Sequence, residues 1–348
     1  MIKSTTLLGS LPTNIPIEQV SFDAALIKEL KVLDIIKPHR KCVHMLKINN
    51  NLEIILRDRI KKGIKEACFQ YGQLLFLNKM YEDAIYYFNL GATKFKDLQC
   101  MYQIGVLYYD GLKVQIDAEL ACGYMKQILY FKELPEARHL IYAAAFNLGR
   151  AYYMGFGVKQ SVEKALEYWL FAADDGSPVA SVYAQTMLGF FYCHEEHLDI
   201  AKAIFWHSEA CSNGSAQSQA VLGVMYFLGI GKKVDFGAAL LCLRHASERG
   251  VIYAQGMLCF YYYSRKLYFN AADLAARVIS AAPDSIGDSS DSMRKGLALA
   301  YFIYARCLNL GFGVQKNACL SQLYSKKSYA WNVEISLYFK QLVGIGQM

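Results

Sequence analysis

The sequence predicts an all-α chain of stacked helix pairs, and three observations lead to this fold class. A motif of apolar and small residues recurs at intervals typical of helical repeats. Residues that suit a helix N-cap follow the motif at a nearly constant distance. The chain of 348 residues is 54% hydrophobic and 14% aromatic with only six prolines, which excludes a disordered or linker-dominated protein. We therefore expect helices throughout and no sheet.

The recurring motif is clearest at 146–158, where the chain reads Phe-Asn-Leu-Gly-Arg-Ala-Tyr-Tyr-Met-Gly-Phe-Gly-Val, and again at 220–231. Its closing Gly-Phe-Gly-Val returns at 311–314. Seven small residues occupy the equivalent position, namely Gly72, Gly105, Gly149, Gly189, Gly223, Cys259 and Ala305. They lie 33, 44, 40, 34, 36 and 46 residues apart, near the period of about 34 to 47 of helical-hairpin repeats. The sequence therefore predicts seven helix pairs, with a small residue where the two helices of a pair approach.

Helix starts and stops follow in the same register. Six residues that favour the N-cap position stand 10 to 12 residues after the small residue: Asp117, Ser161, Asp199, Asp235, Asn270 and Asn317. Glycines fifteen residues beyond the cap suit a left-handed helix end, namely Gly176, Gly214 and Gly250. Each repeat is thus expected to run helix, turn, helix, glycine stop.

With these residues the repeat resembles the Sel-1-like repeat, a relative of the tetratricopeptide repeat. The copy at 146–176 carries Val158, Lys164-Ala165, Trp169 and Ala172-Ala173 where that repeat has them. The segment 66–95 looks more like a tetratricopeptide unit. The resemblance implies a right-handed superhelical solenoid of helix-turn-helix repeats. The chain departs from the pattern at Cys259, Ala305, Ser321 and Ser328, so we expect less secure packing towards its C-terminal end.

Three regions follow from this repeat pattern. Residues 1–65 are expected to form N-terminal capping helices that include a basic segment, with one helix at Ser21–Lys37, ended by Pro38. Residues 66–330 hold about seven helix pairs, the first tetratricopeptide-like and the others Sel-1-like. Residues 331–348 form a C-terminal cap or tail, and Ser328–Gln341, apolar around Trp331 and Phe339, is the candidate capping helix.

The net positive charge of the chain comes from one segment. Between Lys28 and Lys65 there are 11 Lys or Arg and 4 Asp or Glu, whereas the rest of the chain balances 26 against 26. This segment could attract an acidic partner or a lipid headgroup surface. The alternative is an ordinary solvated helix face, because Lys61, Lys62 and Lys65 alternate with Ile60 and Ile64 at helical spacing.

Cysteine usage and the terminal sequences predict a cytoplasmic protein. The ten cysteines are scattered without a C-x-x-C pair, which favours free thiols in a reducing compartment over disulfides or a zinc site. The first residues lack the apolar stretch of a signal peptide. We expect no direct membrane insertion, because the most apolar run, Ile141–Val158, is broken by Asn147 and Arg150.

The motifs that could carry chemistry are weak, so we expect no enzyme and no cofactor. His194-Glu195-Glu196-His197 invites a metal site, but its histidines are three residues apart and not the four of H-E-x-x-H. Gly229-Ile230-Gly231-Lys232 imitates a phosphate-binding loop, but Tyr226 and Lys233 replace the required Gly and Ser or Thr. His207 and His245 are expected to be surface or packing residues. No catalytic residue is predicted.

The candidate binding residues come from the resemblance. In tetratricopeptide-like arrays the first helices line the concave face, and the residues one and four positions after the small residue point into its groove. The partner-binding candidates at these positions are Phe76, Tyr109, Arg150, Tyr153, Phe190, Phe227, Phe260, Tyr263 and Arg306. Aromatic and Arg side chains dominate binding energies in many protein interfaces. The alternative is that these rings pack between neighbouring repeats.

The resulting hypothesis is a non-catalytic cytosolic adaptor or scaffold that binds a partner peptide in its groove. In length and repeat order the chain also resembles adaptors associated with the cytoplasmic tail of the endocytic receptor megalin, which implies that tail or a related receptor tail as partner. No nucleic-acid partner is expected, and the sequence predicts no oligomeric state. The alternative function is a structural subunit that positions components of a larger enzyme complex through its convex or end surfaces. Exposed aromatics on the concave face favour the first hypothesis, and a flat apolar end face favours the second.

Overall fold

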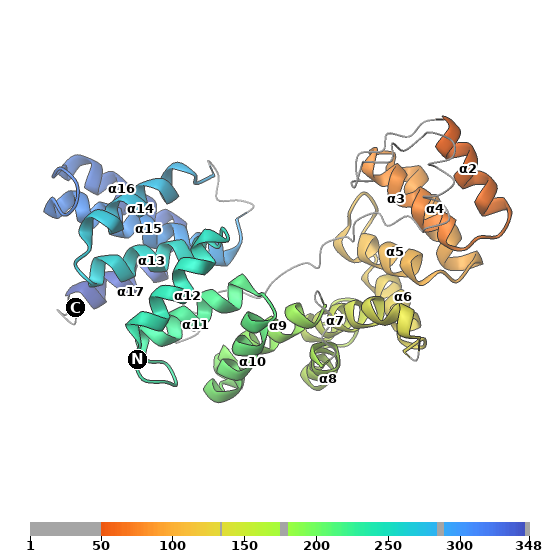
Figure 1. Cartoon of the computed structure of the whole chain (residues 1–348), viewed down its shortest axis with the longest axis horizontal. Helices are drawn as coiled ribbons and strands as arrows, with labels where there is room; N and C mark the ends of the chain where they lie inside the picture. Colours follow the sequence, from red (N-terminus) through yellow and green to blue (C-terminus); the bar gives the residue numbers. More distant parts are fainter. Residues whose placement is uncertain (1–49, 133, 175–179, 284–288, 345–348) are drawn as a thin grey trace. The chain divides into compact units, whose positions relative to one another are not determined.

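The computed structural model describes residues 50–132, 134–174, 180–283 and 289–344 (Figure 1). Within these ranges the chain forms 16 α-helices and no strand, which confirms the expected all-α class. None of the helices in these ranges is both long and apolar enough to cross a membrane. The chain divides into two compact units, and the boundary falls between Ala180 and Ser181.

The N-terminal unit contains α2 to α8. After α2 (Asn50–Lys61) come three helix pairs: α3 (Glu66–Leu77) with α4 (Tyr81–Lys94), α5 (Leu98–Asp110) with α6 (Ala118–Leu129), and α7 (Arg138–Met154) with α8 (Val162–Ala173). A short 3₁₀ helix, η3 (Pro135–Ala137), precedes α7. Consecutive pairs also pack together, since α4 contacts α5 and α6 contacts α7. This unit is a stack of helical hairpins.

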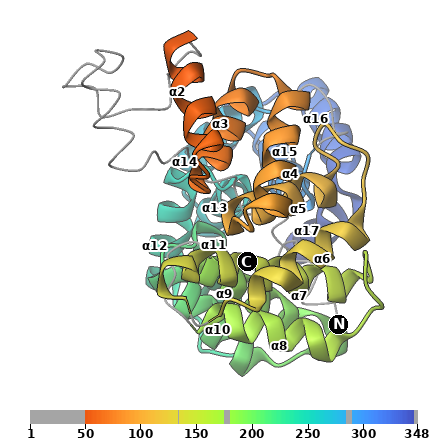
Figure 2. The ribbon, with the colours of Figure 1, turned by 90° about the vertical axis from the view of Figure 1, so that its right-hand side faces the viewer.

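The C-terminal unit contains α9 to α17. Its pairs are α9 (Ala180–Cys193) with α10 (Ile200–Ser212), α11 (Ala216–Leu228) with α12 (Phe236–Glu248), α13 (Ile252–Ser264) with α14 (Tyr268–Ser280), and α15 (Asp291–Leu310) with α16 (Ala318–Trp331). The last helix, α17 (Val333–Gly344), contacts α15 and α16. Figures 1 and 2 show the hairpins along the ribbon. The seven predicted helix pairs are therefore present.

In five of the seven pairs, the small residue of the first helix is a glycine that lies under a large side chain of the second helix. A Cβ at Gly72 would lie 2.6 Å from the ring of Phe88, and a Cβ at Gly223 would lie 2.8 Å from Leu243. Trp169, which is fully buried, stands over Gly149 in the same way. The equivalent pairs are Gly105 with Met125 and Gly189 with His207. The small residue therefore admits the large one, as the repeat motif predicts.

Five of the six predicted N-caps are confirmed. The side chains of Asp117, Ser161, Asp199, Asp235 and Asn317 each accept a hydrogen bond from the backbone N–H three residues on. The prediction for Asn270 is wrong, because α14 begins two residues earlier, after Leu267. Lys266 there takes a positive φ of 60° and turns the chain without a Gly-x-Gly loop. Gly214 and Gly250 have positive φ beyond their helices, as expected. Gly176 lies outside the described residues.

The C-terminal end is better packed than the sequence predicts. The hydroxyl of Ser321 donates to the carbonyl of Ala305 at 2.8 Å, and that of Ser328 donates to the carbonyl of Ala298 at 2.7 Å. Both serines are buried at the contact of α16 with α15, and these hydrogen bonds satisfy their hydroxyl groups. The prediction of one capping helix at Ser328–Gln341 is wrong, because Ser328 belongs to α16 and Asn332 separates α16 from α17. The predicted helix at Ser21–Lys37 lies outside the described residues.

Candidate protein-binding surface

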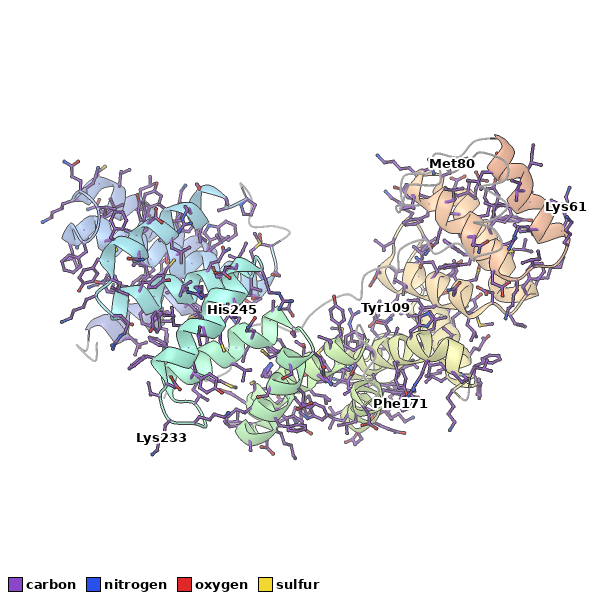
Figure 3. All side chains as sticks on the ribbon, in the orientation of Figure 1. Lys61, Met80, Tyr109, Phe171, Lys233 and His245 are labelled. Atoms are coloured by element: carbon purple, nitrogen blue, oxygen red, sulfur yellow. The ribbon has the colours of Figure 1, made fainter. Side chains whose placement is uncertain are left out.

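The candidate residues all stand on first helices, in the middle or in the last turns. Phe76 lies on α3, Tyr109 on α5, and Arg150 and Tyr153 on α7. In the C-terminal unit the candidates lie on α9, α11, α13 and α15: Phe190, Phe227, Phe260, Tyr263 and Arg306. Figure 3 labels Tyr109 in the N-terminal unit.

Within each unit, the residue four after the small position meets the residue one after it in the next repeat. The guanidinium carbon of Arg150 lies 5.5 Å from the ring centre of Tyr109. The rings of Phe227 and Phe260 are 5.7 Å apart and nearly perpendicular. Arg306 Nε donates a hydrogen bond to the Tyr263 hydroxyl at 3.2 Å. These three contacts form a seam between consecutive first helices. It consists of Tyr109 with Arg150 between α5 and α7, Phe227 with Phe260 between α11 and α13, and Tyr263 with Arg306 between α13 and α15.

The nine candidate residues differ in exposure. Phe76, Tyr109, Tyr153 and Arg306 are half-buried, whereas Arg150, Phe190, Phe227 and Tyr263 are buried. Phe260 has no exposed surface. The half-buried members offer surface to a partner, while the buried rings also join neighbouring helices. Whether any of the nine contacts a partner stays a prediction.

The C-terminal helix covers part of the seam in its own unit. The ring of Phe339 on α17 lies 4.3 Å from that of Phe260, and Phe339 has no exposed surface. An apolar helix of the chain itself therefore occupies the place next to Phe260. In the N-terminal unit the rings of Tyr109 and Tyr153 are half-buried, so the first helices α5 and α7 are the better candidate surface.

The Tyr109–Arg150 pair leaves two buried polar atoms without partners. Neither Arg150 Nε nor the Tyr109 hydroxyl makes a hydrogen bond within the described residues. Burial raises the pKa of Tyr109, and the charge of Arg150 opposes that rise. The pKa of Asp110 is likewise raised by burial and lowered by Arg150. Both polar groups of the pair are hydrogen-bond donors at neutral pH.

The histidine motifs of the sequence do not assemble a described metal site. His194 and His197 have ring centres 6.5 Å apart, and no group of three or more potential ligands occurs in the described part of the chain. His207 is instead the fully buried counterpart of Trp169 in its repeat. Its Nδ1 lies 3.0 Å from the Ser218 hydroxyl and its Nε2 lies 3.8 Å from Cys193 Sγ.

A nucleophilic role for the Cys193–His207 contact is not favoured by its chemistry. Burial raises the pKa of the Cys193 thiol to about 12 and lowers the pKa of His207 to about 3, so both groups are neutral at physiological pH. A reactive cysteine needs a lowered pKa and access to solvent. His207 is therefore a packing residue, as expected, and His245 on α12 is exposed.

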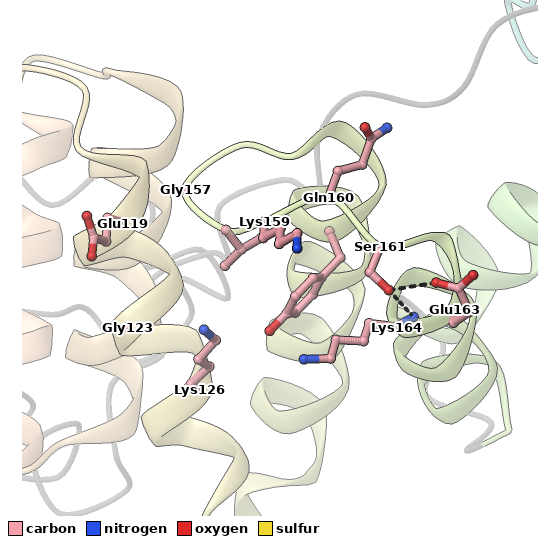
Figure 4. A pocket seen from close by; sticks show the side chains of 11 residues that line it. Glu119, Gly123, Lys126, Gly157, Lys159, Gln160, Ser161, Glu163 and Lys164 are labelled. Carbon is pink, nitrogen blue, oxygen red and sulfur yellow. Dashed lines mark hydrogen bonds between the residues drawn. The ribbon is translucent and has the colours of Figure 1, made fainter.

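The N-terminal unit also has a polar hollow that the sequence patterns did not indicate. Its volume is about 750 Å³, and Figure 4 shows the side chains that line it. Three lysines face it, namely Lys126, Lys159 and Lys164. The ammonium groups of Lys126 and Lys164 lie 5.7 and 5.2 Å from the ring centre of Tyr152. Because Glu119 and Glu163 also line the hollow, its charge is mixed.

Comparisons with known families support the repeat assignment. The family model of the Sel1 repeat matches residues 98–128, 143–177, 182–215 and 216–251. The chain is similar to a Sel1 repeat protein from Oxalobacter formigenes, with a TM-score of 0.53 and 23% identity over 76% of this chain and 95% of that one. It is also similar to a protective antigen of uropathogenic Escherichia coli strains that displays the same fold, with a TM-score of 0.52 and 18% identity over 80% of this chain and 71% of that one. These structures support a Sel1-type solenoid.

The curated relatives match a short part of the chain. DAP3-binding cell death enhancer 1 of Mus musculus is 35% identical over 88 residues, which are 25% of this chain and 16% of that protein. The Rattus norvegicus protein of the same name is 37% identical over 79 residues, 23% of this chain and 15% of that protein. The chain thus aligns with under a fifth of these relatives. None of these comparisons confirms the resemblance to megalin-binding adaptors.

Proposed function

We propose that this chain is a non-catalytic cytoplasmic scaffold that binds an extended segment of a partner protein along the first helices of its N-terminal unit. Sel1 repeats generally mediate contacts between proteins, which supports the coarser part of this proposal. The observation that carries the finer part is the Tyr109–Arg150 contact between α5 and α7, near which the rings of Tyr109 and of Tyr153 on α7 are half-buried. Rings and guanidinium groups of this kind anchor many protein interfaces.

Two partners are worth testing first. The repeat order suggests a receptor tail such as that of megalin, and the names of the mouse and rat relatives suggest DAP3. We propose to screen overlapping peptides of both proteins against the purified full chain. Binding of a peptide from either set would supply the partner, while no binding from either set would favour the alternative of a subunit that acts through its outer or end surfaces.

Replacing Tyr153 with alanine is expected to weaken binding of such a peptide by about thirtyfold, or about 2 kcal/mol. The ring of Tyr153 is half-buried and packs 5.4 Å from that of Trp169, so part of the side chain is exposed at the surface of α7. The measurement is fluorescence anisotropy at a temperature where thermal unfolding shows the variant to be folded.

Tyr86→Ala is the matched control, because this tyrosine of α4 is 62% exposed and stands outside the seam. It should keep wild-type affinity. If Tyr153→Ala binds as tightly as the wild type, the seam is not the binding surface. If Tyr153→Ala is unfolded at the temperature of the assay, the ring belongs to the core and the proposal fails for this residue.

A further inference from the structure

The side chain of Arg150 is largely buried, and among the described residues it contacts the Tyr109 ring but makes no ion pair. Arg150 is only 7% exposed, and its buried Nε makes no hydrogen bond within the described part of the chain. An arginine keeps its charge in proteins, so burial does not neutralise it. A buried charge without an opposite charge is strongly unfavourable. Binding of an anionic ligand would therefore offset the free-energy cost of burying the Arg150 charge.

A second donor stands beside it. The hydroxyl of Tyr109 is also buried and unpaired, and its ring lies 5.5 Å from the Arg150 guanidinium carbon. The two groups come from consecutive first helices, α5 and α7, and they make no hydrogen bond with each other, although a tyrosine hydroxyl can accept as well as donate. Two adjacent unpaired donors, one of them charged, match the oxygens of a carboxylate.

The equivalent pair in the C-terminal unit shows that residues at these two repeat positions can satisfy each other. Arg306 and Tyr263 occupy the same two positions, and there Arg306 Nε donates to the Tyr263 hydroxyl at 3.2 Å. Arg306 is also partly exposed to solvent. That pair satisfies itself, whereas the Tyr109–Arg150 pair does not.

The nearest acidic group does not fill the place of a ligand. Asp110 senses the charge of Arg150, which opposes the rise of its pKa caused by burial. No ion pair joins Asp110 to Arg150 among the described residues. Asp110 also follows Tyr109 at the end of α5, so its backbone position is fixed by the helix.

Around the two donors the surface is aromatic. Phe156, in the turn after α7, packs edge-on against Tyr109 with ring centres 5.0 Å apart, and it is 37% exposed. A ligand that reaches Arg150 would therefore pass an apolar rim. This arrangement favours a carboxylate whose neighbouring residues are apolar.

We propose that Arg150 and Tyr109 form a carboxylate-binding site, which takes an acidic side chain or the C-terminal carboxylate of a partner peptide flanked by apolar residues. The inference rests on the proposed function and specifies its ligand. Arg150 supplies the charge and two or more N–H donors, and the Tyr109 hydroxyl donates to the same group. Lysine would not replace Arg150 fully, because it lacks the planar fork.

The test is an array of seven-residue peptides with a central glutamate and both ends blocked. The two residues that flank the glutamate are varied through all combinations of apolar residues. A matched set has glutamine in place of glutamate, and a third set has no acidic side chain but a free C-terminal carboxylate. Wild-type full chain should bind the best glutamate peptides or the best free-carboxylate peptides at least tenfold more tightly than their neutral counterparts. The set that shows this preference identifies the source of the carboxylate.

Variants assign the preference to the site. Arg150→Met should abolish it, Tyr109→Phe should reduce it severalfold, and Arg150→Lys should retain part of it. Arg244→Met, which removes an exposed charge paired with Glu248 in the other unit, should leave it unchanged. Equal binding of charged and neutral peptides, or an unchanged preference in Arg150→Met, overturns the carboxylate site while leaving the proposed function intact. Failure of every peptide set to bind overturns both.

Independent evidence comes from the free protein. Because Arg150 is unpaired and buried, Arg150→Met should not lower the melting temperature and is expected to raise it. A fall of the melting temperature by several degrees would show that Arg150 is satisfied in the free protein, and the site would then lack the feature on which the inference depends.

Discussion

Replacing Gly256 with alanine is expected to destabilise the C-terminal unit by at least about 3 kcal/mol. Gly256 on α13 meets Gly296 on α15, and the two helix backbones touch there. A Cβ at Gly256 would lie 2.9 Å from the Cα of Gly296 and closer still to its carbonyl oxygen. Backbone atoms cannot rotate away as a side chain can, so the helices must separate. Equilibrium unfolding in urea measures the change.

Gly237→Ala provides the control in the same unit. Gly237 lies in the first turn of α12, and a Cβ there would meet only Asp235 Oδ1 at 3.4 Å. This substitution should leave stability unchanged or raise it by up to about 1 kcal/mol, since alanine loses less conformational freedom in a helix. A Gly256→Ala variant as stable as Gly237→Ala would mean that α13 and α15 are not in backbone contact.

Acid is expected to destabilise the chain through His207, and His207→Leu should remove this contribution. His207 is fully buried and neutral in the folded state, where burial lowers its pKa to about 3. In the unfolded chain its pKa is about 6.5. Below about pH 6.5 the unfolded chain binds a proton that the folded chain does not, so folding weakens by about 1.4 kcal/mol per pH unit until about pH 3.

The measurement compares urea unfolding of wild type and His207→Leu at pH 7.5 and 4.5. In the next repeat the equivalent residue is Leu243, which packs over Gly223, so the variant should fold. Cys193, the titratable group in contact with His207, has a pKa of about 12 and stays neutral at both pH values. The wild type should lose about 2.7 kcal/mol more than the variant over this interval. Equal losses would show that His207 is hydrated or paired in the folded state.

Much of the fold could be predicted because the repeat expresses local rules. A glycine that admits a helix partner and an aspartate that caps a helix act within one hairpin, so Gly149 and Asp235 can be interpreted without knowledge of distant residues. The end of the array was harder. Cys259 breaks the small-residue column, and α13 makes a different close approach, to α15, through Gly256 and Gly296 on different hairpins. Nothing in the local pattern pairs those two glycines.

The sequence predicted where the candidate residues lie along the helices, but not which of them are covered or hydrogen-bonded. Register placed Tyr109 and Arg150 on first helices, and the structure shows that they meet. Register could not tell that Phe260 is covered by Phe339 of α17, because that helix follows the last repeat and has no counterpart elsewhere in the array. It also could not separate Arg150 from Arg306, since the hydrogen bond of Arg306 to Tyr263 depends on side-chain geometry.

The central claim is that a partner segment lies on the seam between α5 and α7. Its most direct test is photo-crosslinking with p-benzoylphenylalanine at position 153, which keeps an aromatic ring on α7 three residues after Arg150, using a bound DAP3 or megalin-tail peptide at saturating concentration. The same group at position 86, on the exposed face of α4, is the control. We predict a covalent peptide adduct from position 153 and none from position 86. An adduct from position 86 alone, or from neither position, would contradict the claim.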